Sequence, residues 1–319
     1  MIRRRQQDRR NKNRLIALVL SLLIGMPSAY GDEAAGDTTW YDATQGRIAR
    51  SLDDSVTWFD DFFGDPRTQT EKEADALLRV TLDAFHSGVD GESEFSVKTS
   101  GYVSLPKFEN KLRLTFSSDA ETAITGEDAV DNEPAARKTS ASDGGLGLAY
   151  LFRDRDKHVF SLGGGLKGGP ELYIKGQHRY THAIDDMSRV RLTNTLYWAT
   201  DDGVGTSSLL DYERSQGLDT VWRYTLFGNI SEVTNDLEWS TQGTWLRRLD
   251  KKTAISARIG INGQTGVKRD VDEYWTSFRY RRNIWRPWLY YELEPGLSWH
   301  HRADYDVEPT MAVRLEMQF

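Results

Sequence analysis

The chain has 319 residues, of which 28% are charged and 11% aromatic, and its formal net charge is −7. It contains no cysteine, which excludes disulfide scaffolds, thiolate metal sites and cysteine nucleophiles. An acidic chain has the wrong sign of charge for binding nucleic acid through its phosphates, so we expect no nucleic-acid partner.

Residues 1–31 have the three parts of a secretory signal peptide. Six arginines and one lysine precede an apolar run from Leu15 to Met26, and Pro27 and a small-x-small site ending at Gly31 follow. The apolar run is too short for a membrane anchor, because a spanning helix needs about 20 residues. We predict cleavage after Gly31, and the long basic start is typical of bacterial export signals.

Residues 32–72 form a separate periplasmic segment with one amphipathic helix, which we predict over about 45–63. Gly64 and Pro66 would end this helix. Two roles are possible for this helix. It is either a plug that packs under or into the domain that follows, or a docking helix for a periplasmic partner. The apolar side chains that helical spacing places on one face include Ile48, Leu52, Phe59, Phe62 and Phe63.

From residue 73 to 319 the sequence alternates between apolar and polar residues with a period of two, which is typical of β-strands. In "SRVRLTNTLYW", for example, Val190, Leu192, Leu196 and Trp198 share one face. The segments exceed the usual strand of about 5–6 residues and match tilted membrane strands of about 9–11 residues plus ends. The candidate strands are 75–86, 92–104, 108–118, 143–153, 158–168, 170–182, 187–199, 204–214, 219–230, 234–247, 252–263, 272–282, 287–301 and 307–319.

The first of these segments, 75–86, fits both a helix and a strand. We predict a strand, because bacterial single-chain barrels have an even number of strands and this choice makes fourteen. A count of twelve, through one wrongly divided pair, stays open. The predicted fold class is therefore all-β, a transmembrane antiparallel β-barrel of about fourteen strands behind a short periplasmic helix.

Two further patterns test this topology. The connections expected in the periplasm, which begin near Pro106 and recur down to 283–286, are about four residues or fewer, whereas the outer connection 119–142 is long. Tryptophans are expected in two belts at the headgroup level of a bilayer. We place Trp222, Trp245, Trp285 and Trp288 at periplasmic strand ends, Trp198, Trp275 and Trp299 at outer ends, and only Trp239 in mid-strand.

The chain ends in a strand whose apolar face runs to the last residue. Met311, Val313, Leu315, Met317 and Phe319 share that face. Here the sequence resembles Gram-negative outer-membrane β-barrels as a class, in which the last strand alternates and ends in an aromatic residue. The resemblance implies a place in the cell outer membrane, contact with its lipid and lipopolysaccharide, and recognition of Phe319 by the barrel insertion machinery. No particular family is identified.

The inward face of the predicted barrel carries charges of both signs. They either line a wet channel and set its selectivity or pair into arginine–carboxylate ladders that fill the lumen. Glycines at 145, 147, 163 and 165 would widen the lumen or admit the helix or the 119–142 loop. The charged candidates are Arg189, Arg191, Arg223, Arg258, Arg279, Arg281, Arg314, Glu213, Glu238, Glu292, Glu294 and Glu316, together with Arg79, Lys98, Arg113, Lys175, Arg179, Asp83, Glu94 and Asp211.

The sequence gives little support for a catalytic or metal-binding site. The six histidines include no His-x-Ser pair, and His178 and His182 lack a third metal ligand nearby. Asp185–Asp186 and Asp201–Asp202 are expected to be solvated turn residues. We therefore predict no catalytic residue, no metal, no cofactor and no enzyme activity.

The function predicted from the sequence is a gated or plugged outer-membrane channel for small polar solutes. One alternative is a structural or assembly barrel that docks a periplasmic partner through its helix. A lipid-modifying enzyme is the third.

Overall fold

The computed structural model describes residues 52, 54–63, 76–88, 93–105, 111–119, 124, 144–154, 157–168, 170–266 and 270–319. The predicted boundaries of the signal peptide and of the periplasmic segment, the residue Ile48 and most of the 119–142 loop lie outside this part of the chain. Residues 54–63 form a helix, and Leu52 is also helical. Among the described residues, no helix is long and apolar enough to cross a membrane.

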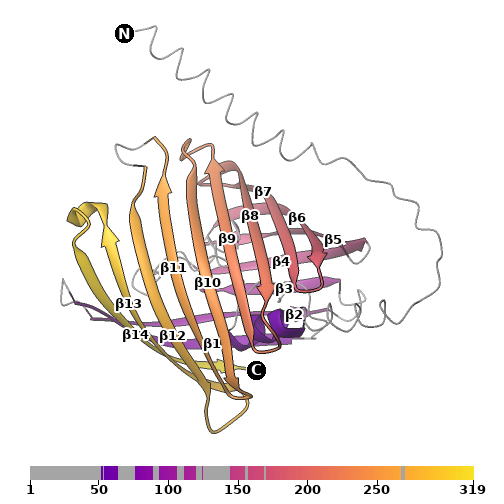
Figure 1. Ribbon diagram of the computed structural model, residues 1–319. Helices are drawn as coiled ribbons and strands as arrows, with labels where there is room; N and C mark the ends of the chain where they lie inside the picture. Colours follow the sequence, from indigo (N-terminus) through magenta and orange to yellow (C-terminus); the bar gives the residue numbers. More distant parts are fainter. Residues whose placement is uncertain are drawn as a thin grey trace, which may run out of the picture. The chain divides into compact units, whose positions relative to one another are not determined.

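Fourteen strands form one closed antiparallel barrel, which confirms the predicted fold class and strand number (Figure 1). Each strand pairs with the next one along the chain. The strands are β1 Ala76–Ser87, β2 Ser93–Ser104, β3 Leu112–Ser117, β4 Gly145–Asp154, β5 His158–Lys167, β6 Glu171–Asp185, β7 Ser188–Ala199, β8 Gly203–Ser215, β9 Thr220–Ser231, β10 Glu238–Asp250, β11 Thr253–Gln264, β12 Glu273–Asn283, β13 Leu289–His300 and β14 Val307–Gln318.

The segment that fitted both a helix and a strand is β1, and it closes the barrel. It pairs with β14 from Arg79 opposite Gln318 to Ser87 opposite Thr310. Leu78 and Phe319 then exchange two backbone hydrogen bonds of 2.9 Å. Closure leaves no strand edge, which is the condition for a sheet to lie in hydrocarbon, where an unpaired backbone group costs several kcal/mol.

The two ends of the barrel differ in their connections. The end at which β1 begins and β14 finishes, here called the periplasmic end, has short turns such as 186–187 and 251–252, and the opposite end carries the connection from 118 to 144. Two periplasmic connections exceed the predicted four residues. The one after β2 is longer because β3 begins at Leu112, and the one after β12 turns through Trp285 at a φ of 54°.

The outward face of the barrel is apolar. Phe95, Leu196 and Ile259 are 67%, 62% and 65% exposed, whereas the residues that alternate with them point into the lumen. Large apolar side chains that stand exposed around a closed barrel are those that a bilayer would cover.

Trp275 is a correction to the predicted tryptophan belts. It is buried in the lumen at 1% exposure, beneath the guanidinium of Arg258 at 5.5 Å from its ring. The reason is parity, since Trp275 alternates in step with Arg279 on β12 and so shares its inward face. Trp239 is the second residue of β10, at the outer end of the strand and not in its middle.

Candidate functional site

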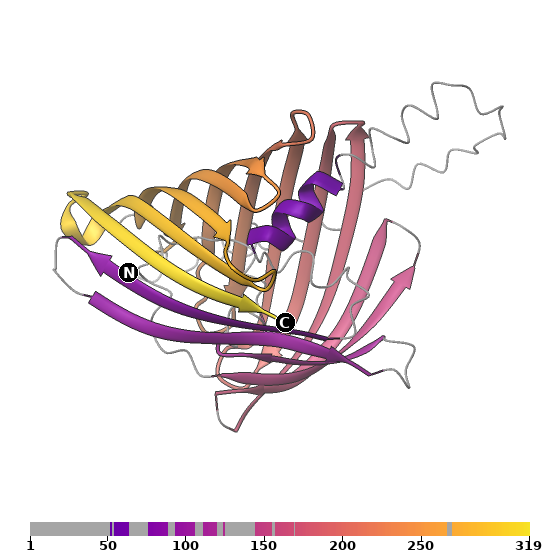
Figure 2. The ribbon, with the colours of Figure 1, turned by 90° about the horizontal axis from the view of Figure 1, so that it is seen from below.

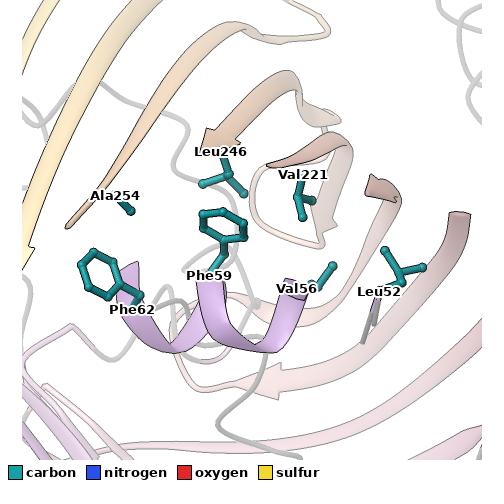
Figure 3. Close-up of a cluster of buried hydrophobic side chains, with 7 residues drawn as sticks. All are labelled: Leu52, Val56, Phe59, Phe62, Val221, Leu246 and Ala254. Atoms are coloured by element: carbon teal, nitrogen blue, oxygen red, sulfur yellow. The ribbon is translucent and has the colours of Figure 1, made fainter. Parts of the chain in front are cut away.

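The helix of residues 54–63 lies inside the ring of strands (Figure 2). Its apolar face and three side chains of the barrel wall form one buried cluster at the periplasmic end (Figure 3). This patch interrupts a wall whose buried residues are mainly polar. The members are Leu52, Val56, Phe59 and Phe62 of the helix, Val221 of β9, Leu246 of β10 and Ala254 of β11.

Aromatic rings extend this contact towards β13. Trp58 stacks on Phe62 with ring centroids 4.7 Å apart, and Phe62 meets the ring of Tyr290 edge-on at 5.5 Å. The guanidinium of Arg248 lies 4.8 Å from the ring of Trp58. Ser55 donates a hydrogen bond of 3.3 Å to the carbonyl of Leu218, in the turn between β8 and β9. The helix is therefore attached to the wall from β9 to β13.

One ionic cluster, here called the Glu213 cluster, surrounds a carboxylate of β8 that is fully buried. Arg189 Nε lies 2.5 Å from Glu213, Arg191 Nη2 lies 3.2 Å from it, and Arg223 Nη2 lies 2.6 Å from it. These arginines come from β7 and β9, the two neighbours of β8, so the register of the barrel brings them together. A buried carboxylate needs such partners because its desolvation costs several kcal/mol.

The helix contributes a carboxylate to the same cluster. Asp60 is 1% exposed, its Oδ1 forms an ion pair with Arg223, and its Oδ2 lies 3.9 Å from Arg191 Nη2. Asp60 was not predicted from the sequence, because its partners Arg191 and Arg223 lie far from it along the chain. Val56 was missed as well, although its spacing of four from Leu52 follows the helical period.

A second network, here called the Glu292 ladder, crosses the other side of the lumen. Arg281 binds Glu292 at 3.2 Å and Glu316 at 2.9 Å, and Arg314 binds Glu294 at 2.6 Å. Each carboxylate is thus shared between strands. The members are Arg79 and Asp83 of β1, Arg258 of β11, Arg279 and Arg281 of β12, Glu292 and Glu294 of β13, and Arg314 and Glu316 of β14.

Of the twenty charged candidates named from the sequence, eleven of the first twelve lie in these two networks, as do Arg79 and Asp83. The twelfth, Glu238, lies at the outer end of β10, where it accepts a hydrogen bond of 3.1 Å from Asn229. Their part in conduction or selectivity stays a prediction.

Gly147, one of the inward glycines, lies beside an aromatic ring of the barrel wall. A Cβ on Gly147 would come within 2.2 Å of the hydroxyl of Tyr173, so this ring takes the space beside β4. The helix packs against β9–β11 instead.

A lysine at the outer rim pairs with two carboxylates, contrary to prediction. Lys167, at the end of β5, lies 2.6 Å from Asp201 and 3.1 Å from Asp202, two residues expected to be solvated. Partial burial raises the pKa of Asp201, but the hydrogen bond and charge of Lys167 outweigh it, and the pKa lies below its ordinary value.

Several histidines in the described part of the chain each pair with one other side chain, and the prediction of no catalytic residue stays a prediction. His86 Nδ1 lies 3.0 Å from Ser93 Oγ on the outward face, a pair between neighbouring strands and so not a His-x-Ser sequence. His158 and His178 pair with each other at 3.1 Å, and His300 pairs with Glu273 at 3.1 Å. Among the described residues, no group of three His, Asp or Glu side chains could hold a metal ion.

The last residue, Phe319, is 58% exposed at the periplasmic end. Its ring stacks on Trp288 with centroids 5.1 Å apart. Its role as an insertion signal stays a prediction.

No family model and no curated protein matches the chain. Among solved structures it is similar to an anion-selective porin from Comamonas acidovorans, with 8% identity, coverage of 76% of this chain and 98% of that chain, and a TM-score of 0.48. It is also similar to a loop-deletion mutant of OmpT, an outer membrane protein of Vibrio cholerae, with 9% identity, coverage of 77% of this chain and 98% of that chain, and a TM-score of 0.46. For OprD of Pseudomonas aeruginosa the identity is 10%, the coverage is 77% of this chain and 95% of that chain, and the TM-score is 0.43. These values are low, and the fold of this chain is established by its own strands and registers.

Those strands and registers make a closed barrel with an apolar exterior and a charged lumen. A barrel of this kind satisfies every requirement of a bilayer, because its backbone groups are paired and its lipid-facing side chains are apolar. The chain is therefore a closed β-barrel suited to span a lipid bilayer, which agrees with the resemblance of its sequence to outer-membrane barrels.

Proposed function

We propose that the chain is a channel for small polar solutes whose periplasmic end is closed by its own helix. The observation that carries this proposal is the position of residues 54–63, which pack inside the barrel through Phe59 and the apolar cluster and pair with the wall through Asp60. The helix obstructs a lumen that would otherwise be lined by polar side chains.

The character of the wall supports a water-filled path. Between the ionic networks and the outer end, β7–β10 present small hydroxyl and amide side chains, which cannot fill a lumen of fourteen strands, since eight strands already leave just enough room for side chains. These inward residues are all buried in the structure, so a path along them requires that the segments covering them move away. They are Thr193, Thr195, Ser207, Thr225, Ser240, Gln242 and Thr244.

The helix is suited to act as a removable plug. It packs against the wall through side chains and belongs to none of the strand pairings, so its release would break no strand pairing. The Glu292 ladder binds strand to strand and would keep the wall rigid when the helix leaves.

Planar-bilayer recording tests the proposal. The mature chain, residues 32–319, should conduct rarely, and a variant lacking residues 45–66 should conduct continuously. Deletion of residues 32–44 alone is the matched control and should behave as the mature chain does. If the variant without the helix inserts into the bilayer and passes no current, the channel proposal is wrong.

Docking of a periplasmic partner is the second candidate. The aromatic face that would bind such a partner is buried against the wall, so a partner would have to displace the helix. Among the described residues, a lipid-modifying activity could draw on the His86–Ser93 pair. If a His86→Ala variant leaves the lipid composition of the membrane unchanged, this candidate is excluded.

A further inference from the structure

Asp60 occupies a position that a carboxylate from another molecule could also occupy. It contacts two arginines, Arg223 directly and Arg191 at 3.9 Å. Glu213 holds the same two arginines from the strand side, at 2.6 Å and 3.2 Å. Their guanidinium groups are therefore positioned by the barrel wall, and the helix adds a carboxylate to a site that the strands have built.

The helix adds a negative charge to a group of buried charges of both signs. The strands supply three arginines, Arg189, Arg191 and Arg223, and two carboxylates, Glu213 and Asp211. Asp211 is fully buried, lies opposite Arg191 in the strand register and accepts a hydrogen bond of 2.7 Å from Thr225. Asp60 is the third carboxylate. Withdrawal of the helix would take one carboxylate away from Arg191 and Arg223. A buried guanidinium that loses a carboxylate partner favours another anion in its place.

We infer that the Arg191–Arg223 pair binds the carboxylate of the transported solute, and that Asp60 is its internal competitor. This inference rests on the proposed channel function and names its substrate class, small carboxylates. Guanidinium groups suit that ligand because their planar donors match a carboxylate. Since helix and solute share one site, the solute carboxylate favours the undocked helix and opens the channel it passes through.

The test records the full mature chain in planar bilayers at constant ionic strength, with succinate or its uncharged diamide, succinamide, as the probe. We expect succinate to raise the open fraction severalfold and succinamide to leave it unchanged. In Asp60→Asn, whose barrel residues are all intact, the channel should open more often. Succinate should then act at a concentration about tenfold lower, because a competitor that makes a charge-assisted hydrogen bond is lost.

Two arginine variants complete the test. Arg223→Gln should abolish the response to succinate, and Arg247→Gln, an equal change of charge on the exposed outward side of β10, should keep it. If Asp60→Asn conducts but succinate and succinamide act alike, the carboxylate site is wrong and the channel stands. If neither the mature chain nor Asp60→Asn passes current under any condition, the channel proposal falls and this inference falls with it.

Discussion

Glu213 illustrates how single residues are constrained in this lumen. It is fully buried, and arginines from both neighbouring strands surround it. The Coulomb attraction in such a cluster is offset by the desolvation of each charge, so the cluster as a whole adds little net stability. Removing the central carboxylate alone is a different matter, because it leaves three guanidinium groups close together.

Glu213→Gln should therefore destabilise the barrel strongly. We expect a loss of about 3–5 kcal/mol in the free energy of unfolding, the usual cost of breaking a buried ion pair on one side. Urea titration in phospholipid vesicles, followed by tryptophan fluorescence, measures it. Asp219→Asn is the control, since the exposed pair of Asp219 with Arg248 should contribute about 0–1 kcal/mol. Equal stabilities of the two variants would contradict the role given to Glu213.

Gly260 is fixed by its neighbour Trp275. A Cβ at this position would lie 2.4 Å from the indole ring, which cannot move far beneath Arg258. Gly260→Ala should lower the free energy of unfolding by about 1–3 kcal/mol, as overpacking of a filled interior does.

The control for this substitution is Gly176→Ala, because a Cβ on Gly176 would meet nothing within 4 Å. The same urea titration should find that variant as stable as the parent chain. If both alanine variants unfold at the same urea concentration as the parent chain, the packing of Trp275 against β11 is wrong.

The sequence predicted which charges point inward but not which of them meet. Alternation with a period of two gives the face of a residue, whereas its neighbours depend on the register between strands and on the docking of the helix. Asp60 was missed for this reason. Nothing in the local sequence distinguishes it from Asp61, which is partly exposed.

At the scale of elements, the helix is held by few side chains. Phe59 is 1% exposed and lies beside Leu246 of the wall (Figure 3). Phe59→Ala should weaken docking by about 3–5 kcal/mol, the range measured for large-to-small changes in cores. In bilayer recordings the open fraction should rise steeply, whereas Asp54→Ala, at an exposed position of the same helix, should behave as the parent chain does. An unchanged open fraction in Phe59→Ala would show that the helix does not gate the pore.

The last strand has two separable features at its end. The backbone of Phe319 pairs with Leu78, and its ring stacks on Trp288. Phe319→Ala keeps the backbone bonds, so the purified chain should refold into detergent micelles as the parent does. In cells we expect severalfold less of it in the outer membrane, as the resemblance to outer-membrane barrels implies. Equal amounts of Phe319→Ala and of the parent chain in the outer membrane would contradict a role of the ring in insertion.

Most elements were predictable because each strand shows lipid one face and the lumen the other. The β1 segment was ambiguous in isolation, and only the even strand number assigned it. The start of β3 at Leu112 was missed because the alternation continues before it, and a strand begins where it finds a partner. The helix was predicted from its periodicity, but its place in the lumen depends on the apolar patch of β9–β11, whose members lie far apart in the sequence.

At the scale of the molecule, two surfaces of opposite character explain the architecture. The outside is apolar and belongs in hydrocarbon, and the inside holds charges that are neutralised across strands and by the helix. The closing pair of β1 and β14 makes both surfaces continuous. The central claim is that, within this barrel, docking of residues 54–63 closes the channel.

A reversible cross-link between helix and wall tests that claim most directly. The chain has no cysteine, so Val56→Cys with Val221→Cys, two members of the apolar cluster, can be joined by a short bis-methanethiosulfonate linker that dithiothreitol removes. In a single bilayer, we expect no openings while the linker is present and the return of the mature chain's rare openings after its removal, with either single-cysteine variant insensitive to both reagents. Current that is the same before and after removal of the linker would contradict the account.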